Sequence, residues 1–418
     1  MNLLLKSATI IDKSSPFHLQ KNDILISNGV ITKISKFIEN PNNFKEVALK
    51  NLHISQGWFD SSVCFGEPGF EERETIENGL KTAAKSGFTA VAVNPYTNPV
   101  ADNKSAIEFI KNKAAGNLVE LYPIGNLTKA GESKDMAELF DMQNSGAVAF
   151  GDYKKPISNA NLLKIALQYV QIFDGLILSF PQDNSIAGSG LVNEEKNSTK
   201  LGLVGIPTMA EEMQIARDLF ILEYSGGKLH IPTISTKKSV KLIKDAKKKG
   251  LNVTCSVSAH HLVLTDDELV NFDANTKVSP PLRTLTDIKA LIKGLNSGVI
   301  DMITSDHNPI DVEHKKVEYS NAKYGTIGLE SLFGALNKPV GLETLIECLT
   351  TNPRNRFNIM SSSIKEGEKA NITLFNPDNE YTFTEENIQS TSKNAIFSNK
   401  KLNGSVYGVI SNKKVILN

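Results

Sequence analysis

Strand-like patterns stand near both ends of the chain. LLLKSATII and DILISNGVITKISKF, close to the N-terminus, are short apolar runs interrupted by polar residues. Asn28-Gly29 within the second run is typical of a two-residue hairpin turn. ANITLFNP, GSVYGVISN and KKVILN, close to the C-terminus, have the same character. We therefore expect one small β-sandwich domain made from residues 1–52 and 363–418.

The long middle segment, residues 53–362, alternates apolar strand patterns with amphipathic helical patterns. The strand-like stretches are HISQGWFDS, TAVAVNP, VELYPIGN, AVAFGD, GLILSF, KLHIPTIS, NVTCSVS and IDMITSD. Helical stretches between them, such as ETIENGLKTAAKSG and KKSVKLIKDAKKKG, end in glycine, as helix C-caps commonly do. Eight such units over about 300 residues predict a (β/α)₈ barrel. An open doubly wound sheet is the alternative, but no GxGxxG follows a strand to favour it.

Composition narrows the class of partner and the compartment. The 418 residues carry 46 Lys and Arg against 46 Asp and Glu, and this balance argues against nucleic acid or an anionic membrane as the main partner. Three cysteines without CxxC spacing fit a reducing compartment. MNLLLKSATIIDK has no basic region ahead of its apolar run, and no run approaches the roughly 20 residues that span a bilayer. We expect a cytoplasmic protein.

In a barrel of this type, the residues that follow each strand form the functional face. A metal hydrolase would place histidines and carboxylates there, because these side chains hold zinc while leaving a position open for water. The residues at these positions are Ser62, Cys64, Tyr96, Thr97, Asp152, Ser179, Thr233, His260, His261, Asp306 and His307, and they include only a partial set of such ligands.

Five segments carry a specific likeness: LGLVGIPTMAEEMQIARD (201–218), IPTISTKKSVKLIKDAKKKGLNVTCSVSAHHL (231–262), KVSPPLR (277–283), TSDHNP (304–309) and YGTIGLE (324–330). With them the chain resembles dihydroorotase of the amidohydrolase superfamily over essentially its whole length. That enzyme closes carbamoyl aspartate to dihydroorotate in pyrimidine biosynthesis. The resemblance implies the amidohydrolase barrel and a site built around zinc.

The resemblance also implies four imidazole metal ligands, and this chain has none of them in place. Ser62 and Cys64 stand where the first-strand motif Asp-x-His-x-His has its two histidines. Ser179 replaces the histidine that opens the family's His-x-Glu-Asp segment. Thr233, in HIPTIST, replaces the second histidine of His-Ile-x-His-Leu-Ser-Thr. We therefore expect neither bound zinc nor another cofactor.

Substrate contacts implied by the resemblance are altered as well. Gly66 stands at the arginine that grips the substrate carboxylate, and Tyr96 stands at the asparagine of Asn-Thr-x-Pro. Ser279 replaces the asparagine of Val-Asn-Pro-Pro-Leu-Arg, and Ile310 replaces the second histidine of Asp-His-Ala-Pro-His.

The positions that are retained are acidic. Asp306 matches the family's catalytic base and metal ligand, and Asp152 matches the carboxylate of the fourth-strand motif, although FGDYKK departs from Ser-Asp-Asp-Gly. These two carboxylates are the residual candidates for a metal, and with a thiolate from Cys64 they would suit hard cations better than zinc. We expect His307 to face the former pocket in a hydrogen-bonded structural role.

Three functional hypotheses follow. The first is a dihydroorotase-like protein of pyrimidine biosynthesis without dihydroorotase activity. The resemblance implies a scaffold or regulatory role for it, because silent chains of this family assemble with aspartate transcarbamoylase; it also implies a homodimer. The second is an amidohydrolase whose rebuilt site, at most mononuclear, acts on a cyclic amide or imide, with Tyr96 and Ser179 shaping the pocket. The third is a metal-free sensor that holds a small molecule in the old pocket.

Overall fold

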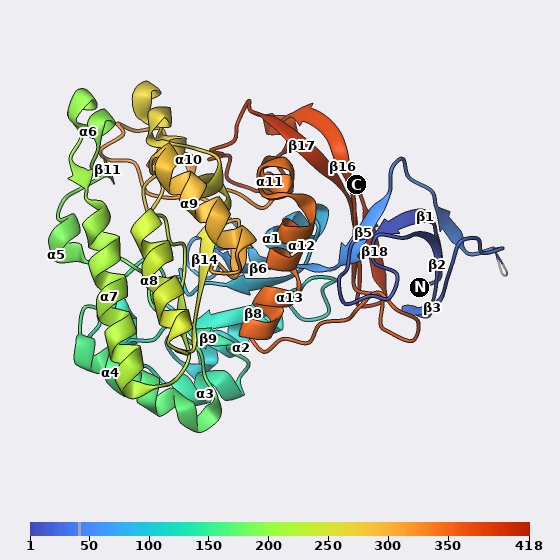
Figure 1. The fold of residues 1–418 in the computed structure, drawn as a ribbon. Coiled ribbons are helices and arrows are strands. Elements are labelled where there is room, and N and C mark those ends of the chain that lie inside the picture. Colours follow the sequence, from blue (N-terminus) through green and yellow to red (C-terminus); the bar gives the residue numbers. More distant parts are fainter. Residues whose placement is uncertain (41–42) are drawn as a thin grey trace.

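A closed barrel of parallel strands forms the larger part of the molecule (Figure 1). The computed structural model describes residues 1–40 and 43–418. Each strand of the barrel sheet pairs with the next in chain order, and a bridge between Val63 and His307 joins the eighth strand's exit to the first strand. The strands are β6 (Trp58–Val63), β7 (Phe88–Val93), β8 (Glu120–Gly125), β9 (Ala149–Phe150), β10 (Ile177–Leu178), β13 (Leu229–Ile231), β14 (Val253–Ser258) and β15 (Met302–Thr304). The predicted (β/α)₈ barrel is confirmed.

Helices cover the outside of the barrel. They are α1 (Ile76–Lys85), α2 (Lys104–Lys113), α3 (Leu139–Asn144), α4 (Ala160–Val170), α7 (Thr208–Ser225), α8 (Lys237–Lys248), α9 (Leu285–Asn296), α10 (Val312–Lys315), α11 (Leu332–Val340), α12 (Leu342–Leu349) and α13 (Thr351–Arg356). An excursion after β10 adds α5 (Asn184–Ala187), β11 (Val192–Asn193), α6 (Lys196–Leu201) and β12 (Gly205–Ile206). Helices α1, α7 and α8 are followed by glycines with positive φ, as the sequence predicts.

The two ends of the chain share a second sheet, to the right in Figure 1. Its strand order is β18-β17-β16-β5-β1-β2-β3, with β4 (Lys45–Val47) alongside β1. The strands are β1 (Leu3–Ile10), β2 (Lys21–Ser27), β3 (Val30–Ser35), β5 (His53–Gln56), β16 (Ile372–Thr382), β17 (Lys401–Ser411) and β18 (Lys414–Leu417). This β domain therefore continues past residue 52 to Gln56, which pairs with Ile372.

The hairpin expected at Asn28-Gly29 is confirmed. Strands β2 and β3 pair antiparallel with Ser27 opposite Val30. Asn28 and Gly29 have φ values of 51° and 79°, which matches a turn that needs positive φ at both central residues.

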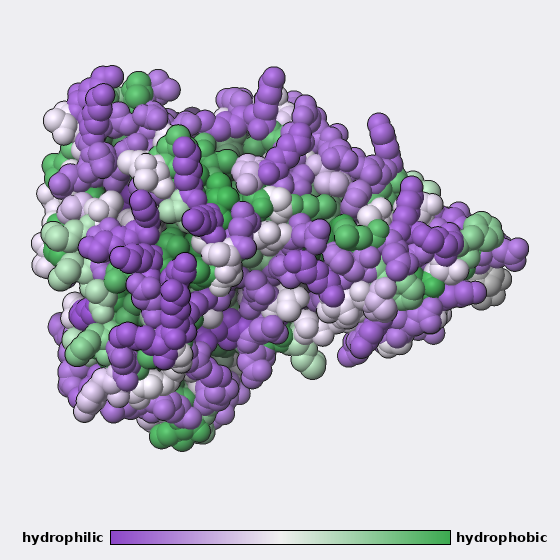
Figure 2. Space-filling model, viewed as in Figure 1, coloured by the Kyte–Doolittle hydropathy of each residue, from purple (hydrophilic) through white to green (hydrophobic). Residues whose placement is uncertain are grey.

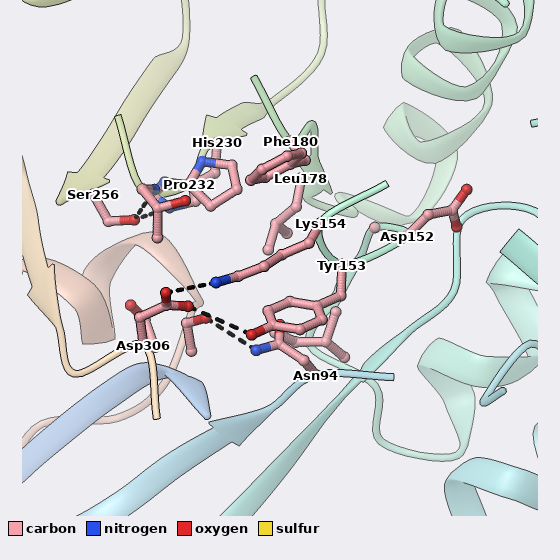
Figure 3. A pocket seen from close by; sticks show the side chains of 15 residues that line it. Asn94, Asp152, Tyr153, Lys154, Leu178, Phe180, His230, Pro232, Ser256 and Asp306 are labelled. Carbon is pink, nitrogen blue, oxygen red and sulfur yellow. Dashed lines mark hydrogen bonds and ion pairs between the residues drawn. The ribbon is translucent and has the colours of Figure 1, made fainter. Parts of the chain in front are cut away.

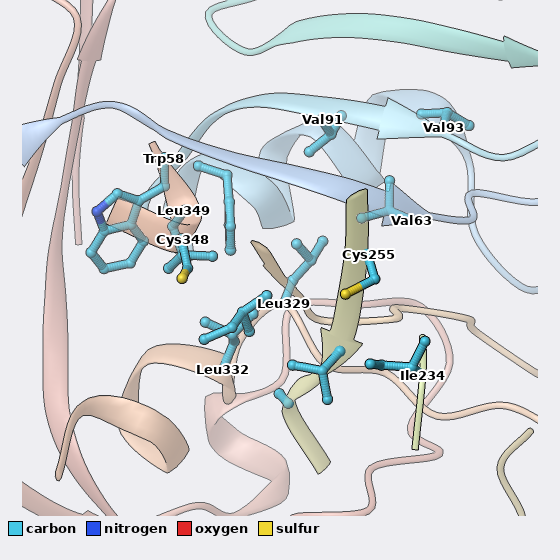
Figure 4. Packing of buried hydrophobic residues seen from close by; sticks show 14 of the residues in the cluster. Trp58, Val63, Val91, Val93, Ile234, Cys255, Leu329, Leu332, Cys348 and Leu349 are labelled. Atoms are coloured by element: carbon cyan, nitrogen blue, oxygen red, sulfur yellow. The ribbon is translucent and has the colours of Figure 1, made fainter. Parts of the chain in front are cut away.

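The barrel and the β domain are joined through an aromatic core. Trp58 at the start of β6 is fully buried, and its ring lies 4.9 Å from that of Phe333 and 5.6 Å from that of Phe375. All six residues of β6 and of β7 are buried, as expected of parallel strands covered on both faces. Figure 4 shows this packing from Trp58 towards Cys255. A rigid barrel therefore carries the side chains at the strand ends.

In the described part of the chain, none of the helices combines the length and the apolar character needed to cross a membrane.

Candidate functional site

A small pocket lies at the carboxyl ends of the barrel strands, where the site of a barrel enzyme belongs (Figure 3). The space open to the centre of a water molecule is about 20 Å³. One water needs on the order of 10–15 Å³ of such space, so the pocket has room for one or two waters. Its lining comes from most of the strand ends: Ser61, Ser62, Asn94, Ile124, Gly151, Asp152, Tyr153, Lys154, Leu178, Phe180, His230, Pro232, Thr233, Ser256 and Asp306.

An ion pair occupies the centre of this pocket. Lys154, from the loop after β9, extends across the pocket and places its Nζ 2.7 Å from Oδ2 of Asp306, after β15 (Figure 3). Both side chains are shielded from solvent, with 13% of Lys154 and 1% of Asp306 exposed. The hydroxyl of Tyr153 lies 3.5 Å from the other carboxylate oxygen. The Asp306 carboxylate is therefore occupied by groups of the chain itself.

Burial and charge act against each other on this pair. Burial raises the pKa of Asp306, and the Lys154 ammonium counters part of that rise. Burial also raises the pKa of Tyr153 well above its usual value, so its hydroxyl keeps its proton at neutral pH. The structure thus holds a carboxylate, an ammonium and a neutral phenol in contact.

Backbone conformations around the pocket are unusual. Lys154, Thr233 and Asp306 have φ values of 51°, 48° and 51°, in the left-handed region that non-glycine residues seldom adopt. Such conformations cluster at functional sites, where the surrounding structure enforces them. The backbone at these three positions is therefore of the kind found at functional sites.

Asp152 lines the pocket, but its carboxylate points away from Asp306 (Figure 3). Oδ1 accepts hydrogen bonds from the backbone N–H groups of Leu127 and Thr128, both at 2.9 Å, and Oδ2 accepts one from the Thr128 hydroxyl. The structure does not bring the two candidate metal carboxylates together, because the loop after β8 satisfies Asp152.

The first-strand motif keeps its aspartate for a structural purpose. Asp60 accepts hydrogen bonds from the backbone N–H groups of Ser62 (3.1 Å) and Ser305 (3.0 Å), and from the Thr304 hydroxyl at 2.5 Å. It therefore joins the end of β6 to the end of β15. Burial raises its pKa to about 6. Ser62, at a family ligand position, accepts a hydrogen bond from Asn94 at 2.9 Å.

Of the sequence-predicted positions, the pocket brings together Ser62, Asp152, Thr233 and Asp306. The others lie outside its lining: Cys64, Gly66, Tyr96, Thr97, Ser179, His260, His261, Ser279, His307 and Ile310.

Two of these outlying positions have partners elsewhere. Ser179 donates its hydroxyl hydrogen bond to Asp218 on α7 at 2.6 Å. The ring of Tyr96 packs at a tilt against the rings of Phe70 and Tyr153, at centroid distances of 5.9 Å and 5.6 Å. Ser179 and Tyr96 therefore make contacts within the barrel and do not line the pocket.

Cys64, Gly66, Ser279 and Ile310 are buried or half-buried in the loops that follow the barrel strands. Cys64 is buried, and burial raises its pKa to about 12, so it is a thiol and not a thiolate. Gly66 has φ 76°, and a Cβ there would lie 2.6 Å from the Phe70 carbonyl oxygen. Ser279 is half-buried, and Ile310 donates its backbone N–H to Asn394 at 3.1 Å.

The histidines near the barrel mouth are buried and uncharged. His307 accepts backbone hydrogen bonds at Nδ1 from Gly328 and Leu329, and burial lowers its pKa to about 4. His261 directs Nε2 at the carbonyl oxygens of residues 280 and 281, both at 3.1 Å, and burial lowers its pKa to about 3. His260 is buried beside it. Both ring nitrogens of His261 have hydrogen-bond partners, whereas Nε2 of His307 is buried without one among the described residues.

Sequence reasoning missed most of the residues that line the pocket. Among them are the polar side chains of Asn94, Tyr153, Lys154 and His230. The departure of FGDYKK from the family motif was the signal for Tyr153 and Lys154, and HIPTIST contains His230. His230 hydrogen bonds to Thr254 and Ser256, and burial lowers its pKa well below the usual value.

Comparison with solved structures shows the same fold in amidohydrolases. L-hydantoinase (dihydropyrimidinase) from Arthrobacter aurescens superposes with a TM-score of 0.88 at 21% identity, covering 100% of this chain and 96% of that one. Dihydropyrimidinase from Brevibacillus agri gives 0.85 at 19% identity, covering 100% and 95%. The fold is thus that of the hydantoinase-type amidohydrolase barrel.

Sequence relatives identify the family within that class. A family model described as Dihydro-orotase-like matches residues 53–239. A dihydroorotase from Acetivibrio thermocellus is 38% identical over 423 residues, covering 99% of both chains. One from Caldicellulosiruptor saccharolyticus is 39% identical, covering 99% of this chain and 98% of its own. The chain belongs to the dihydroorotase family.

The residues present do not fit the metal that this family implies. Zinc prefers imidazole, thiolate and carboxylate donors, with the carboxylate free to bind. Here Asp306 holds an ammonium, Asp152 is turned to other donors, and Cys64 is protonated. Within residues 1–40 and 43–418, no three His, Cys, Asp or Glu side chains are grouped so as to hold an ion.

Proposed function

We propose that this chain is a dihydroorotase homologue without dihydroorotase activity that serves as a structural subunit for aspartate transcarbamoylase in pyrimidine biosynthesis. One observation carries the first half. The Lys154 ammonium holds the Asp306 carboxylate in a pocket with room for one or two waters.

Electrostatics explain why this arrangement opposes metal-dependent hydrolysis. A divalent cation that approached Asp306 would meet the positive charge of Lys154 at the same carboxylate. Without a bound metal, a water molecule keeps a pKa near 15.7 instead of about 7, and little hydroxide forms at neutral pH.

Space opposes the substrate as well. A six-membered ring bearing a carboxylate is several times larger than a water molecule. The side chains of Tyr153, Lys154 and Phe180 line the pocket, and the space of about 20 Å³ that is left is too small for such a ring. Gly66, at the position of the carboxylate-binding arginine, offers no bidentate partner to the substrate.

The partner is proposed from the family resemblance. Silent dihydroorotase-like chains assemble with aspartate transcarbamoylase, and a chain that keeps the whole barrel and its rim bonds suits a role based on shape. The hydrogen bonds that Asp60 accepts from Thr304 and Ser305, which join the first and eighth strands, support this reading. They stabilise the barrel mouth without any bound ion.

The first experiment tests catalytic silence. Protein purified without chelator is assayed for metal by plasma mass spectrometry, and for carbamoyl aspartate cyclisation and dihydroorotate hydrolysis with added zinc or manganese. We expect less than about a tenth of a metal ion per chain and no turnover above buffer, the same as for Asp306→Asn. Turnover that both a chelator and Asp306→Asn abolish would reject the proposal in favour of a rebuilt cyclic-amide hydrolase.

The second experiment tests the partner. The chain is mixed with the aspartate transcarbamoylase of its own organism over a range of concentrations, and the mixture is separated by size. We expect co-elution and a change in the transcarbamoylase's quaternary structure. Separate elution at every concentration would refute the proposed role as a subunit of aspartate transcarbamoylase. It would not affect the proposal that the chain lacks dihydroorotase activity.

A further inference from the structure

Lys315, the last residue of α10 (Figure 1), is a buried lysine that lines a groove at the carboxyl end of the barrel. The groove lies between the loops that follow β14 and β15 and residues 385–394. About 900 Å³ of it is open to the centre of a water molecule. Lysines usually extend into water, and hydrophilic side chains cover most of the face shown in Figure 2. Lys315 is only 6% exposed and therefore needs a separate explanation.

Another buried lysine, Lys277, shows what the chain supplies to hold an ammonium group. It is 2% exposed. Its Nζ donates hydrogen bonds to the carbonyl oxygens of Tyr319 and Ser320, at 2.8 Å and 2.9 Å. The same Nζ lies 5.5 Å and 5.0 Å from the ring centres of Tyr319 and Tyr324, within the range of a cation–π contact. Two acceptors and two aromatic rings therefore stabilise the charge of Lys277.

Lys315 has much less to hold a charge. Its Nζ donates one hydrogen bond, to the carbonyl oxygen of Ala274 at 2.8 Å. An ammonium group carries three N–H donors, so the charged form leaves two of them without an acceptor in the part of the chain that the structure describes. The neutral amine leaves only one. The hydrogen bonding of Lys315 therefore favours the amine over the ammonium form.

The charges near Lys315 act in the same direction. Burial lowers the pKa of Lys315 to about 7, Lys277 and Lys154 lower it further, and Asp273 counters them in part. The other charged residues that line the groove are Glu72, Asp311, Glu313, Lys316, Glu385 and Lys393. No carboxylate within residues 1–40 and 43–418 forms an ion pair with Lys315. At pH 7 about half of the Lys315 side chains are then neutral, against about 0.04% for a lysine with the ordinary pKa of about 10.4.

From the groove, the burial and the single hydrogen bond we propose that the neutral amine of Lys315 is a covalent modification site, which takes the acyl group of small acyl phosphates that enter the groove. The amine nitrogen forms a bond to the acyl carbon, and the bond from that carbon to the phosphate oxygen breaks. Inorganic phosphate leaves, and the nitrogen loses one proton to water. The product is a neutral amide, which is less costly to bury than an ammonium.

The groove also supplies charge for the leaving group. Lys316 and Lys393 line it, and their ammonium groups attract a phosphate. The apolar side chains of Phe272, Val312 and Val317 in the same lining suit the acyl part. The proposal is independent of whether the chain hydrolyses a cyclic amide or binds a transcarbamoylase.

The test uses acetyl phosphate as the probe and the native full-length protein. Mass spectrometry of the peptides gives the rate of acetylation at each lysine, at about pH 7 and about pH 9.5. Lys316 is the matched control, because it is the next residue, lines the same groove and is exposed. Lys277 is the control for access, because it is buried and does not line the groove. Protein unfolded in urea gives the reactivity of each lysine without the fold.

We expect Lys315 to be acetylated about 10-fold or more faster than Lys316 at pH 7. The neutral fraction favours Lys315 by about 1,000-fold, and the lower nucleophilicity of a less basic amine takes back about 50-fold if the Brønsted slope is about 0.5, as for thiols. The ratio should fall about 100-fold at pH 9.5, where Lys316 gains neutral amine and Lys315 is already neutral. It should approach one in urea, and Lys277 should be labelled only there.

Two results would overturn the proposal. The first is native Lys315 that is acetylated no faster than Lys316 at pH 7, which would mean that the groove does not deliver the probe to a reactive amine. The second is a ratio that stays the same at both pH values, because the reacting form of Lys315 would then not be a neutral amine that the fold maintains.

Discussion

Replacing Lys154 with methionine tests the interpretation of the pocket as an internal ion pair. Methionine keeps most of the side-chain volume but removes the ammonium that lies 2.7 Å from Asp306. The variant leaves a carboxylate that is 1% exposed without its counter-ion. We expect Lys154→Met to destabilise the folded barrel at neutral pH, and less so in mild acid.

The size of the effect can be bounded from both sides. At 2.7 Å and an effective dielectric constant of about 20, the gross attraction is roughly 6 kcal/mol, and removing one partner of a buried pair costs about 3–5 kcal/mol. An unpaired carboxyl escapes by taking up a proton, which costs about 1.4 kcal/mol for each pH unit above its ordinary pKa of about 3.9. Protonation of Asp306 therefore limits the loss of stability to about 5 kcal/mol at pH 7.5 and to about 2 kcal/mol at pH 5.5.

The direction with pH follows from proton linkage. In the variant, burial without Lys154 raises the pKa of Asp306 further, so the folded state holds a proton that the unfolded state releases above about pH 4. Stability of the variant therefore falls, relative to the wild type, as pH rises from 4 towards 7.5. We expect a loss of about 3–5 kcal/mol at pH 7.5 that shrinks to about 2 kcal/mol at pH 5.5.

Urea unfolding gives the measurement, with the fluorescence of Trp58 as the probe. Trp58 is the single tryptophan of the sequence, and it is buried where the barrel meets the β domain. Lys155→Met, at the exposed neighbouring lysine, is the matched control. In the double variant Lys154→Met/Asp306→Asn no charge is left unpaired, so most of the stability should return. A loss below 1 kcal/mol, or one that is equal at both pH values, would refute the reasoning.

Three further predictions concern groups around the barrel. The thiols should not react with Ellman's reagent at pH 8 until the protein unfolds, because all are buried with raised pKa values; rapid native labelling would contradict this for Cys64, Cys255 and Cys348. Asp60→Ala removes the acceptor of three hydrogen bonds, two of which link β6 to the end of β15, and should lower the free energy of unfolding by about 2–4 kcal/mol; an unchanged urea midpoint would count against that role. Gly404→Ala should lose 2 kcal/mol or more, because φ is 102° and the new Cβ would lie 2.7 Å from a buried phenylalanine ring; an unshifted melting temperature would show that the ring can move.

The fold was predictable because periodicity reports burial directly. Strands such as VELYPIGN and NVTCSVS are apolar runs of the right length, and the helices between them keep one polar side. The turn at Asn28-Gly29 was predictable for a local reason, since few residues accept positive φ. Each of these features depends on side chains close together in the sequence.

The interior of the pocket was less predictable, because its contacts join distant segments. FGDYKK shows that the fourth-strand motif has changed, but not that Lys154 reaches a carboxylate 152 residues further along. Nor does it show that Asp152 turns to the N–H groups of Leu127 and Thr128. The direction of a side chain depends on which partner the fold brings near, and the motif alone does not contain that information.

The changes at the site make physical sense when they are taken together. A family member that lost its imidazole ligands while keeping Asp306 would be left with a buried carboxylate that has no cation, a state that costs several kcal/mol. Lys154 supplies a cation from within the chain at 2.7 Å, and its side chain lines the pocket together with Tyr153. The ion pair that neutralises Asp306 therefore also opposes the binding of a second cation at that carboxylate. Stability of the barrel, and not residual chemistry, is then sufficient to account for the ion pair, and the double variant of Lys154 and Asp306 separates the two explanations.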